Sequence, residues 1–303
     1  MKTFTSIITF IGLFFVQFIF AQISLADLPK DKIMVVAHRG DWRNFPENSI
    51  KAVENAMKLG ADIVEVDLKR SKDGILIILH DKTLDRTTTG KGLASEKTWS
   101  EIQKLKLRNG AGMPTQEKIP TLEELLNFIK GKKVLVNLDK AWDYFDEVFA
   151  LIEKTDTKSQ IILKGNSPAK ELKAKYGKKL DGFIYMPMVW PTDYTIYDNE
   201  SIDPIKYMQD FAKTYQPIAY EVIIKDDNKK ADEVLKFVKD NGALIWINAL
   251  WAELCAGNHD DAAVDNPEKI YGWYLEKGAN IIQTDRIELL VNFLKSKNAK
   301  YEP

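Results

Sequence analysis

Cysteine, histidine and excess charge are all scarce in this chain. Its 303 residues include one cysteine, Cys255, and three histidines. A single cysteine excludes an internal disulfide framework, so the hydrophobic core must supply the stability. With 43 Lys and Arg against 44 Asp and Glu, the chain has no basic excess for binding nucleic acid and no acidic tail. This balance leaves a small anionic substrate open, because a pocket needs only a few local cations.

Long apolar runs are also rare, except near the N-terminus. Lys2 is followed by the run IITFIGLFFVQFIFA, which ends at Ala21, and a second small-residue site ends at Ala26. This pattern predicts a secretory signal peptide over residues 1–26, with an uncleaved membrane anchor as the alternative. No cysteine lies near the cleavage region, which argues against a lipid anchor. We therefore expect residues 27–303 to be periplasmic or secreted, with no stable membrane insertion after cleavage.

After residue 30, short apolar runs alternate with segments of helical periodicity. Eight runs are candidate strands: 33–37, 62–68, 133–139, 160–164, 181–185, 217–223, 243–248 and 280–284. The helical segments include 48–60, 121–131, 231–242 and 267–278. Eight βα units in one chain of this length predict an α/β fold, a (β/α)8 TIM barrel. A doubly wound open sheet is the alternative, but no glycine-rich phosphate loop follows the first strand.

One apolar run breaks the alternation. Residues 75–81 follow the second strand after only Asp73-Gly74, a strong signal for a two-residue hairpin loop. If Lys72 lies opposite Ile75, then Asp67 lies opposite His80, and the two side chains share one sheet face. A slip of one residue would turn His80 away.

The next segment, at about 83–120, shows no clear strand pattern and is long for a βα loop. It predicts a small insertion after the hairpin, covering one side of the barrel mouth. The tail after about residue 296 is expected to fray.

Polar side chains gather where the predicted strands end, which in a barrel is the active face. They are His38, Arg39, Glu65, Asp67, Asp139, Lys164 and Asn248. Glu65, Asp67 and Asp139 form a three-carboxylate set, and hard oxygen ligands suit Mg²⁺ or Ca²⁺. The alternative for these acids is that they merely face solvent.

The two histidines and two cations complete a set suited to phosphodiester cleavage. His38 and His80 can serve as acid and base, because imidazole titrates near working pH; the alternative is a pair of core histidines. Arg39 and Lys164 can bind phosphate oxygens, or instead form ion pairs and line the rim. Three tryptophans, Trp142, Trp190 and Trp251, fall in loops that could wall the pocket. Glu47 is expected to order its loop, and His259 to lie in an ordinary exposed loop.

These residues resemble the glycerophosphodiester phosphodiesterase family. The matching pieces are HRG at 38–40, PENS at 46–49, EVDLKRSKDG at 65–74, LHDKTLDRTTTG at 79–90 and IPTLEELL at 119–126. Weaker matches are NLD at 137–139, WIN at 246–248 and QTDR at 283–286. The sequence departs from the family at Asp139, where the family usually has Glu with Lys two residues later; here Lys140 follows directly.

The resemblance implies a (β/α)8 barrel with a small insertion, one divalent cation, Ca²⁺ or Mg²⁺, and two catalytic histidines. By position, the metal ligands are Glu65, Asp67 and Asp139, and the acid–base pair is His38 and His80. Arg39, Lys164 and Trp246 are the expected substrate-binding residues. The implied reaction is hydrolysis of a small glycerophosphodiester to an alcohol and glycerol phosphate, through a cyclic phosphate.

Three alternatives stay open at this point. A related barrel could act on lysophospholipid or inositol-phosphate headgroups and stop at the cyclic product. A non-catalytic protein could bind phosphorylated headgroups. A structural envelope protein could retain an old barrel. The oligomeric state, the alcohol and the histidine that acts first as base are not given by the sequence.

Overall fold

The computed structural model describes residues 25–192, 194–196 and 200–302. Most of the predicted signal peptide therefore lies outside the described residues. Within them, no helix is both long and apolar enough to cross a membrane.

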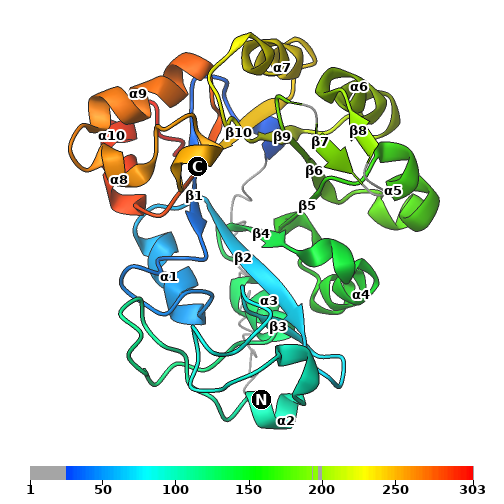
Figure 1. The fold of residues 1–303 in the computed structure, drawn as a ribbon, viewed down its shortest axis with the longest axis vertical. Coiled ribbons are helices and arrows are strands. Elements are labelled where there is room, and N and C mark those ends of the chain that lie inside the picture. The colour runs from blue at the N-terminus through cyan, green and yellow to red at the C-terminus, as the bar shows by residue number, and fades with distance from the viewer. Residues whose placement is uncertain (1–24, 193, 197–199, 303) are drawn as a thin grey trace, which may run out of the picture.

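Eight parallel strands close into a barrel, as predicted (Figure 1). They are β1 Met34–His38, β2 Ile63–Arg70, β4 Leu135–Asp139, β5 Ile161–Gly165, β6 Ile184–Val189, β9 Ala219–Val222, β10 Leu244–Asn248 and β11 Ile281–Thr284. The order around the barrel is β1-β11-β10-β9-β6-β5-β4-β2, and pairing of β1 with β2 closes it. Two short strands, β7 Tyr194–Ile196 and β8 Glu200–Ile202, form a separate hairpin.

Helices surround the strands (Figure 1). They are α1 Ile50–Lys58, α2 Trp99–Ile102, α3 Leu122–Ile129, α4 Phe145–Thr155, α5 Ala169–Tyr176, α6 Pro204–Thr214, α7 Lys229–Asp240, α8 Asp260–Ala263, α9 Pro267–Lys277 and α10 Ile287–Ser296. The predicted start of α3 is confirmed, because Thr121 and Glu124 form a reciprocal capping box.

The alternation of side chains along each strand separates two apolar clusters. One set, which includes Val35 and Val64, packs outward against the helices. The other set fills the barrel near the amino ends of the strands and includes Met34, Ile63 and Trp246. Toward the carboxyl ends of the same strands, the next inward-facing positions are occupied by polar residues, namely His38, Glu65 and Asn248. The strand pattern therefore delivers polar groups to one mouth of the barrel.

The hairpin after β2 forms, but its predicted register was wrong by one residue. Leu68 pairs with Ile78 of β3, Leu76–Ile78, and the Leu79 N–H donates to the Asp67 carbonyl over 2.9 Å. Three residues rather than two form the loop, with Gly74 at a φ of +87°, a conformation that glycine adopts readily. His80 still reaches the site, because the chain leaves the strand before it.

The segment after the hairpin contains α2, a short 3₁₀ turn and isolated bridges rather than a full strand. A small apolar cluster holds it against the hairpin, with Ile77, Leu84, Ile102 and Leu107 among its members. In Figure 1 it lies beside β3, beyond the end of β2. The domain boundaries given by the sequence, 1–26, 27–303 and the insertion at about 83–120, stay predictions.

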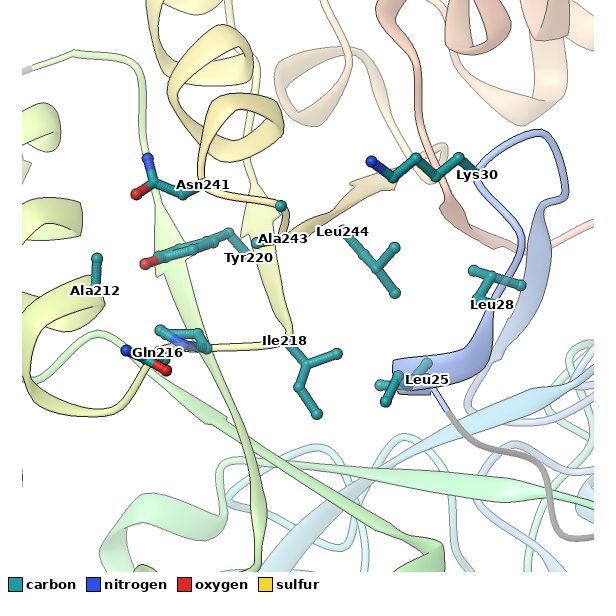
Figure 2. A pocket seen from close by; sticks show the side chains of 13 residues that line it. Leu25, Leu28, Lys30, Ala212, Gln216, Ile218, Tyr220, Asn241, Ala243 and Leu244 are labelled. Atoms are coloured by element: carbon teal, nitrogen blue, oxygen red, sulfur yellow. The ribbon is translucent and has the colours of Figure 1, made fainter.

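Residues near both ends of the described chain pack against the amino ends of the strands. Leu25, which falls within the predicted leader, is 2% exposed and packs in the barrel cluster with Leu28; such burial contributes about 2 kcal/mol. The expectation of a frayed tail was wrong for Lys300, whose ammonium lies 2.7 Å from buried Asp62. Figure 2 shows Leu25 and Leu28 beside a cavity of about 570 Å³, at the opposite end of the barrel from the polar mouth.

Candidate active site

Three carboxylates meet at the barrel mouth. One oxygen from each of Glu65, Asp67 and Asp139 lies within 4.8 Å of the other two. Adjacent strands produce this, because Asp67 of β2 pairs in register with Asp139 of β4. Glu65 and Asp67 are each 1% exposed. Burial, and then the charge of Asp67, raise the pKa of Glu65 to about 7.

The donor set fits a hard divalent cation. Each carboxylate points an oxygen into one small space, and close negative charges repel unless a cation offsets them. Two ammonium groups do so in part. Lys140 Nζ lies 2.6 Å from Asp67 Oδ1, and Lys164 Nζ lies 3.6 Å from Asp139 Oδ1. Burial would raise the pKa of Asp67, but Lys140 and Arg39 hold it well below its usual range.

His38 is held in a defined orientation. Its Nδ1 lies 2.8 Å from Asp285 Oδ1, and its Nε2 lies 3.1 Å from Arg39 Nε. Because Arg39 Nε can only donate, Nε2 must accept, and Nδ1 carries the proton that Asp285 accepts. Trp42 Nε1 also donates to Asp285 Oδ1, over 2.6 Å. The ring of Trp251 meets His38 edge-on, with a centroid distance of 6.2 Å.

His80 has a matching support on the other side of the carboxylate cluster. Its Nδ1 lies 2.6 Å from Asp81 Oδ1, and its Nε2 lies 4.0 Å from Asp67 Oδ1. Arg86 fixes Asp81 from the insertion, with Nε 2.8 Å from Asp81 Oδ2. The side chain of His80 is 32% exposed against 10% for His38. Burial is the main cause that lowers the pKa of His80, although Asp67 opposes it.

Arg39 sits at the centre of the first loop, at a φ of +54°. Its backbone N–H donates to Glu65 over 3.0 Å, and its guanidinium lies 3.1 Å from Glu47 and 3.5 Å from Asp67. The next residue, Gly40, allows this turn, because a Cβ there would come within 2.7 Å of the α1 backbone.

Glu47 and Asn48 order this loop, the role expected for Glu47. Glu47 binds Arg86 as well as Arg39, with its Oε2 2.6 Å from Arg86 Nη1. Asn48 donates to Asp67 Oδ2 over 3.0 Å and accepts from the Asp67 backbone N–H over 3.1 Å. The amide thereby fixes one carboxylate oxygen and leaves the other toward Lys140.

A buried polar chain lines the opposite wall of the mouth. Trp246 donates from Nε1 to Asn248 over 2.8 Å, and Asn248 donates to Glu221 over 2.7 Å. Glu221 lies 3.2 Å from Lys164. Burial would lower the pKa of Lys164, but Asp139 and Glu221 raise it well above its usual value. The ring of Trp246 is fully buried, so any effect of Trp246 on substrate passes through Asn248.

Sequence reasoning missed Glu221, Asp81 and Asp285 as functional candidates. Glu221 occupies an inward-facing position of β9. The alternation of side chains along PIAYEVI could have indicated this position, because Glu221 lies two residues after Ala219. Asp285 follows β11 directly, in the QTDR segment. Of the loop tryptophans, Trp251 contacts His38 and Trp142 lines a cavity beside His80.

The comparisons with known proteins agree with this geometry. Residues 38–178 match the glycerophosphoryl diester phosphodiesterase family model. A glycerophosphodiester phosphodiesterase of Caldanaerobacter subterraneus is 47% identical over 113 residues, 36% of this chain and 45% of that protein. The first part of the chain is thus similar to glycerophosphodiester phosphodiesterases. Human glycerophosphodiester phosphodiesterase 1 is 43% identical over 102 residues, 32% of this chain and 30% of its own length.

The family match is confined to the first part of the chain. These relatives are aligned over less than half of their own length, and residues 185–294 match the model of a domain of unknown function. Structural likeness extends further. A glycerophosphoryl diester phosphodiesterase of Parabacteroides distasonis has a TM-score of 0.74 at 23% identity, covering 91% of this chain and 93% of that one. The barrel is therefore shared. Lys164 lies within the segment that matches the family model, whereas Glu221 lies in the segment that matches the domain of unknown function.

Proposed function

We propose that this chain hydrolyses phosphodiesters with a neighbouring hydroxyl, such as glycerophosphodiesters, to an alcohol and glycerol phosphate. The main support is the pair of histidines beside one carboxylate cluster. The Nδ1 atom of each histidine lies within hydrogen-bond distance of a different aspartate. Such an arrangement supplies a base and an acid in fixed tautomers. A structural neighbour supports the product class. A phosphodiesterase of Oleispira antarctica, with a TM-score of 0.59 and 18% identity, was solved in complex with its product sn-glycerol-3-phosphate.

Glu65, Asp67 and Asp139 would hold one divalent cation, Mg²⁺ or Ca²⁺. When bound, such a cation neutralises phosphate charge and lowers the pKa of a nearby hydroxyl. Arg39 and Lys140 now lie on the carboxylates. With those charges offset, Arg39 can turn its guanidinium to a non-bridging phosphate oxygen. Lys164 keeps the wall beside Asp139 positive.

We assign the first proton abstraction to His38 from its contacts. The lone pair of His38 Nε2 accepts a hydrogen bond from Arg39. If a substrate hydroxyl took the place of Arg39, it would donate to Nε2 and could transfer its proton to that atom. His80 then protonates the departing alcohol, because it is the more exposed histidine and borders an open cavity. Attack of the neighbouring hydroxyl oxygen on phosphorus forms a cyclic phosphate. In the second step water opens the ring, with the histidine roles reversed.

Phosphorus-31 NMR of the products tests this reaction directly. With glycerophosphocholine as substrate, we expect a cyclic glycerophosphate signal that rises and then gives way to glycerol phosphate. Accumulation of the cyclic product with lysophospholipid, without later hydrolysis, would favour the alternative that the enzyme stops at the ring. Binding of a phosphorylated headgroup with no new phosphorus signal would favour the non-catalytic binding protein.

Asp285→Asn is predicted to shift the pH dependence of the reaction. Burial would lower the pKa of His38, but Asp285 and then Glu65 raise it above its usual value. A base must be neutral, so the rate falls as pH drops through this pKa. Removing the charge of Asp285 should move the acid limb of kcat/KM down by roughly one pH unit and lower kcat at least about tenfold.

Asp261 of α8 provides a matched control. Asp261 is exposed and pairs with Arg43 and Arg286 without touching His38. Asp261→Asn removes the same charge and should leave the profile in place. An unchanged acid limb in Asp285→Asn would exclude His38 as the base that this limb reports.

We also propose export of the protein by its N-terminal apolar run, with action in the periplasm or outside the cell. This proposal rests on the sequence pattern of residues 1–26 alone.

A further inference from the structure

A cavity of about 770 Å³ adjoins His80, outside the carboxylate cluster. Three parts of the chain enclose it: the end of β2, the residues from His80 into the insertion, and the loop after β4. Its lining includes Lys69, His80, Lys82, Lys140, Trp142 and Tyr144. His80 is the proposed acid for the departing alcohol, so this cavity lies where that alcohol would sit. Its size suits a group larger than glycerol.

The cavity is rich in cations. Lys69, Arg70, Lys82 and Lys140 line it, against the acids Asp81 and Asp143. Several of these charges are already paired: Lys140 with Asp67, Arg70 with Glu147, and Asp81 with Arg86. Lys69 and Lys82 are in no ion pair among the described residues, and Asp143 is the one lining acid that remains to offset them, so the cavity keeps a net positive charge.

Lys69 is the more constrained of the two. It is partly buried, and its ammonium donates to the Leu68 carbonyl over 3.0 Å. Across the described residues, no carboxylate lies within 4.0 Å of that ammonium, the distance of an ion pair. Asp67, Asp139 and Asp143 act on this ammonium only from beyond that distance. A partly buried cation without a direct ion pair can gain one from an anionic ligand.

The strand β2 places Lys69 on the same face as two of the three clustered carboxylates. Side chains alternate along a strand, so Lys69 shares a face with Glu65 and Asp67. Lys69 lies two residues beyond Asp67, which separates their Cα atoms by roughly 7 Å. An anion on Lys69 would therefore sit about one sugar ring away from a phosphate at the carboxylate cluster. Trp142 and Tyr144 provide flat apolar surface on the wall of the same cavity, as a ring between two phosphates requires.

We propose that this cavity receives the departing alcohol, and that Lys69 selects alcohols carrying a second anionic group, namely phosphorylated polyols. Lys82 adds positive charge at the outer edge. This inference rests on the proposed function, because it assigns the alcohol side of that same site. It predicts a substrate with two phosphates, one cleaved and one used for recognition.

Two matched substrates isolate the second phosphate. Glycerophosphoinositol 4-phosphate and glycerophosphoinositol differ only in that group, so the ratio of their kcat/KM values measures its recognition. We expect a ratio of at least about ten in favour of the phosphorylated substrate, the size of one charge-assisted hydrogen bond. Lys69→Gln should lower that ratio about tenfold. Lys72→Gln removes the same charge from an exposed position of the same hairpin and should leave the ratio unchanged.

Calorimetry separates this inference from the reaction itself. Inositol 4-phosphate and myo-inositol, the two free alcohols, are titrated into wild-type protein and Lys69→Gln. Tighter binding of inositol 4-phosphate, lost in Lys69→Gln, supports the subsite even if no diester is turned over. Turnover of both diesters at equal kcat/KM, or equal binding of the two alcohols, overturns the subsite and leaves the proposed function intact.

Discussion

Alanine at either His38 or His80 is expected to lower kcat by roughly 10²- to 10⁴-fold, the usual contribution of a positioned acid or base. The two residues act in both steps, so the double variant should lose little more than the worse single variant. The measurement is steady-state turnover of a glycerophosphodiester, with circular dichroism and thermal unfolding to confirm the fold.

The chain offers a matched control for this experiment. Its third histidine, His259, precedes α8 and lies outside the carboxylate cluster, so His259→Ala should keep full turnover. The structural effect of His38→Ala is expected to be small, because Trp42 still donates to Asp285. Near-normal turnover in both His38→Ala and His80→Ala would exclude the acid–base mechanism.

Removing divalent cations is expected to lower turnover by about 10³-fold, because several kcal/mol of charge stabilisation would be lost. The close approach of two buried carboxylates, Glu65 and Asp67, and the partly buried Asp139 also predicts a physical effect without any substrate. Mg²⁺ or Ca²⁺ should raise the unfolding temperature of the chelator-treated protein, since the cation binds only the folded cluster.

Glu65→Gln provides the specific test of that site. It removes one carboxylate and should weaken cation binding, measured as bound metal per chain and as loss of the cation-dependent rise in unfolding temperature. Burial raises the pKa of Glu65 to about 7, and cation binding requires the deprotonated form, so wild-type affinity should fall as pH drops below about 7. Glu171→Gln, at an exposed position of α5, is the control. Full metal content in Glu65→Gln would contradict the three-carboxylate site.

The barrel was predictable because its signal repeats. Each strand is a short apolar run and each helix carries its own periodicity, so errors of one or two residues at the ends do not change the count. Strand ends also predict where His38, Glu65, Asp67 and Asp139 lie, since carboxyl ends of parallel strands meet at one mouth. The sequence therefore indicated the site without a resemblance to any family.

Contacts between distant segments were not predictable in the same way. The register after β2 depends on whether Gly74 closes a two-residue or a three-residue loop, and both fit Asp73-Gly74. Asp285 meets His38 only because β11 lies beside β1, and Lys300 meets Asp62 across nearly the whole chain. Trp246 was expected at the substrate, but its inward position on β10 places it below Asn248.

The most direct test is product release by the purified protein from glycerophosphodiesters and lysophospholipids, with and without Mg²⁺ and Ca²⁺. The account predicts cation-dependent release of the alcohol together with glycerol phosphate from at least one glycerophosphodiester. Cation binding without turnover of any substrate would contradict it, would favour a binding protein, and would make Asp139 the first residue to question.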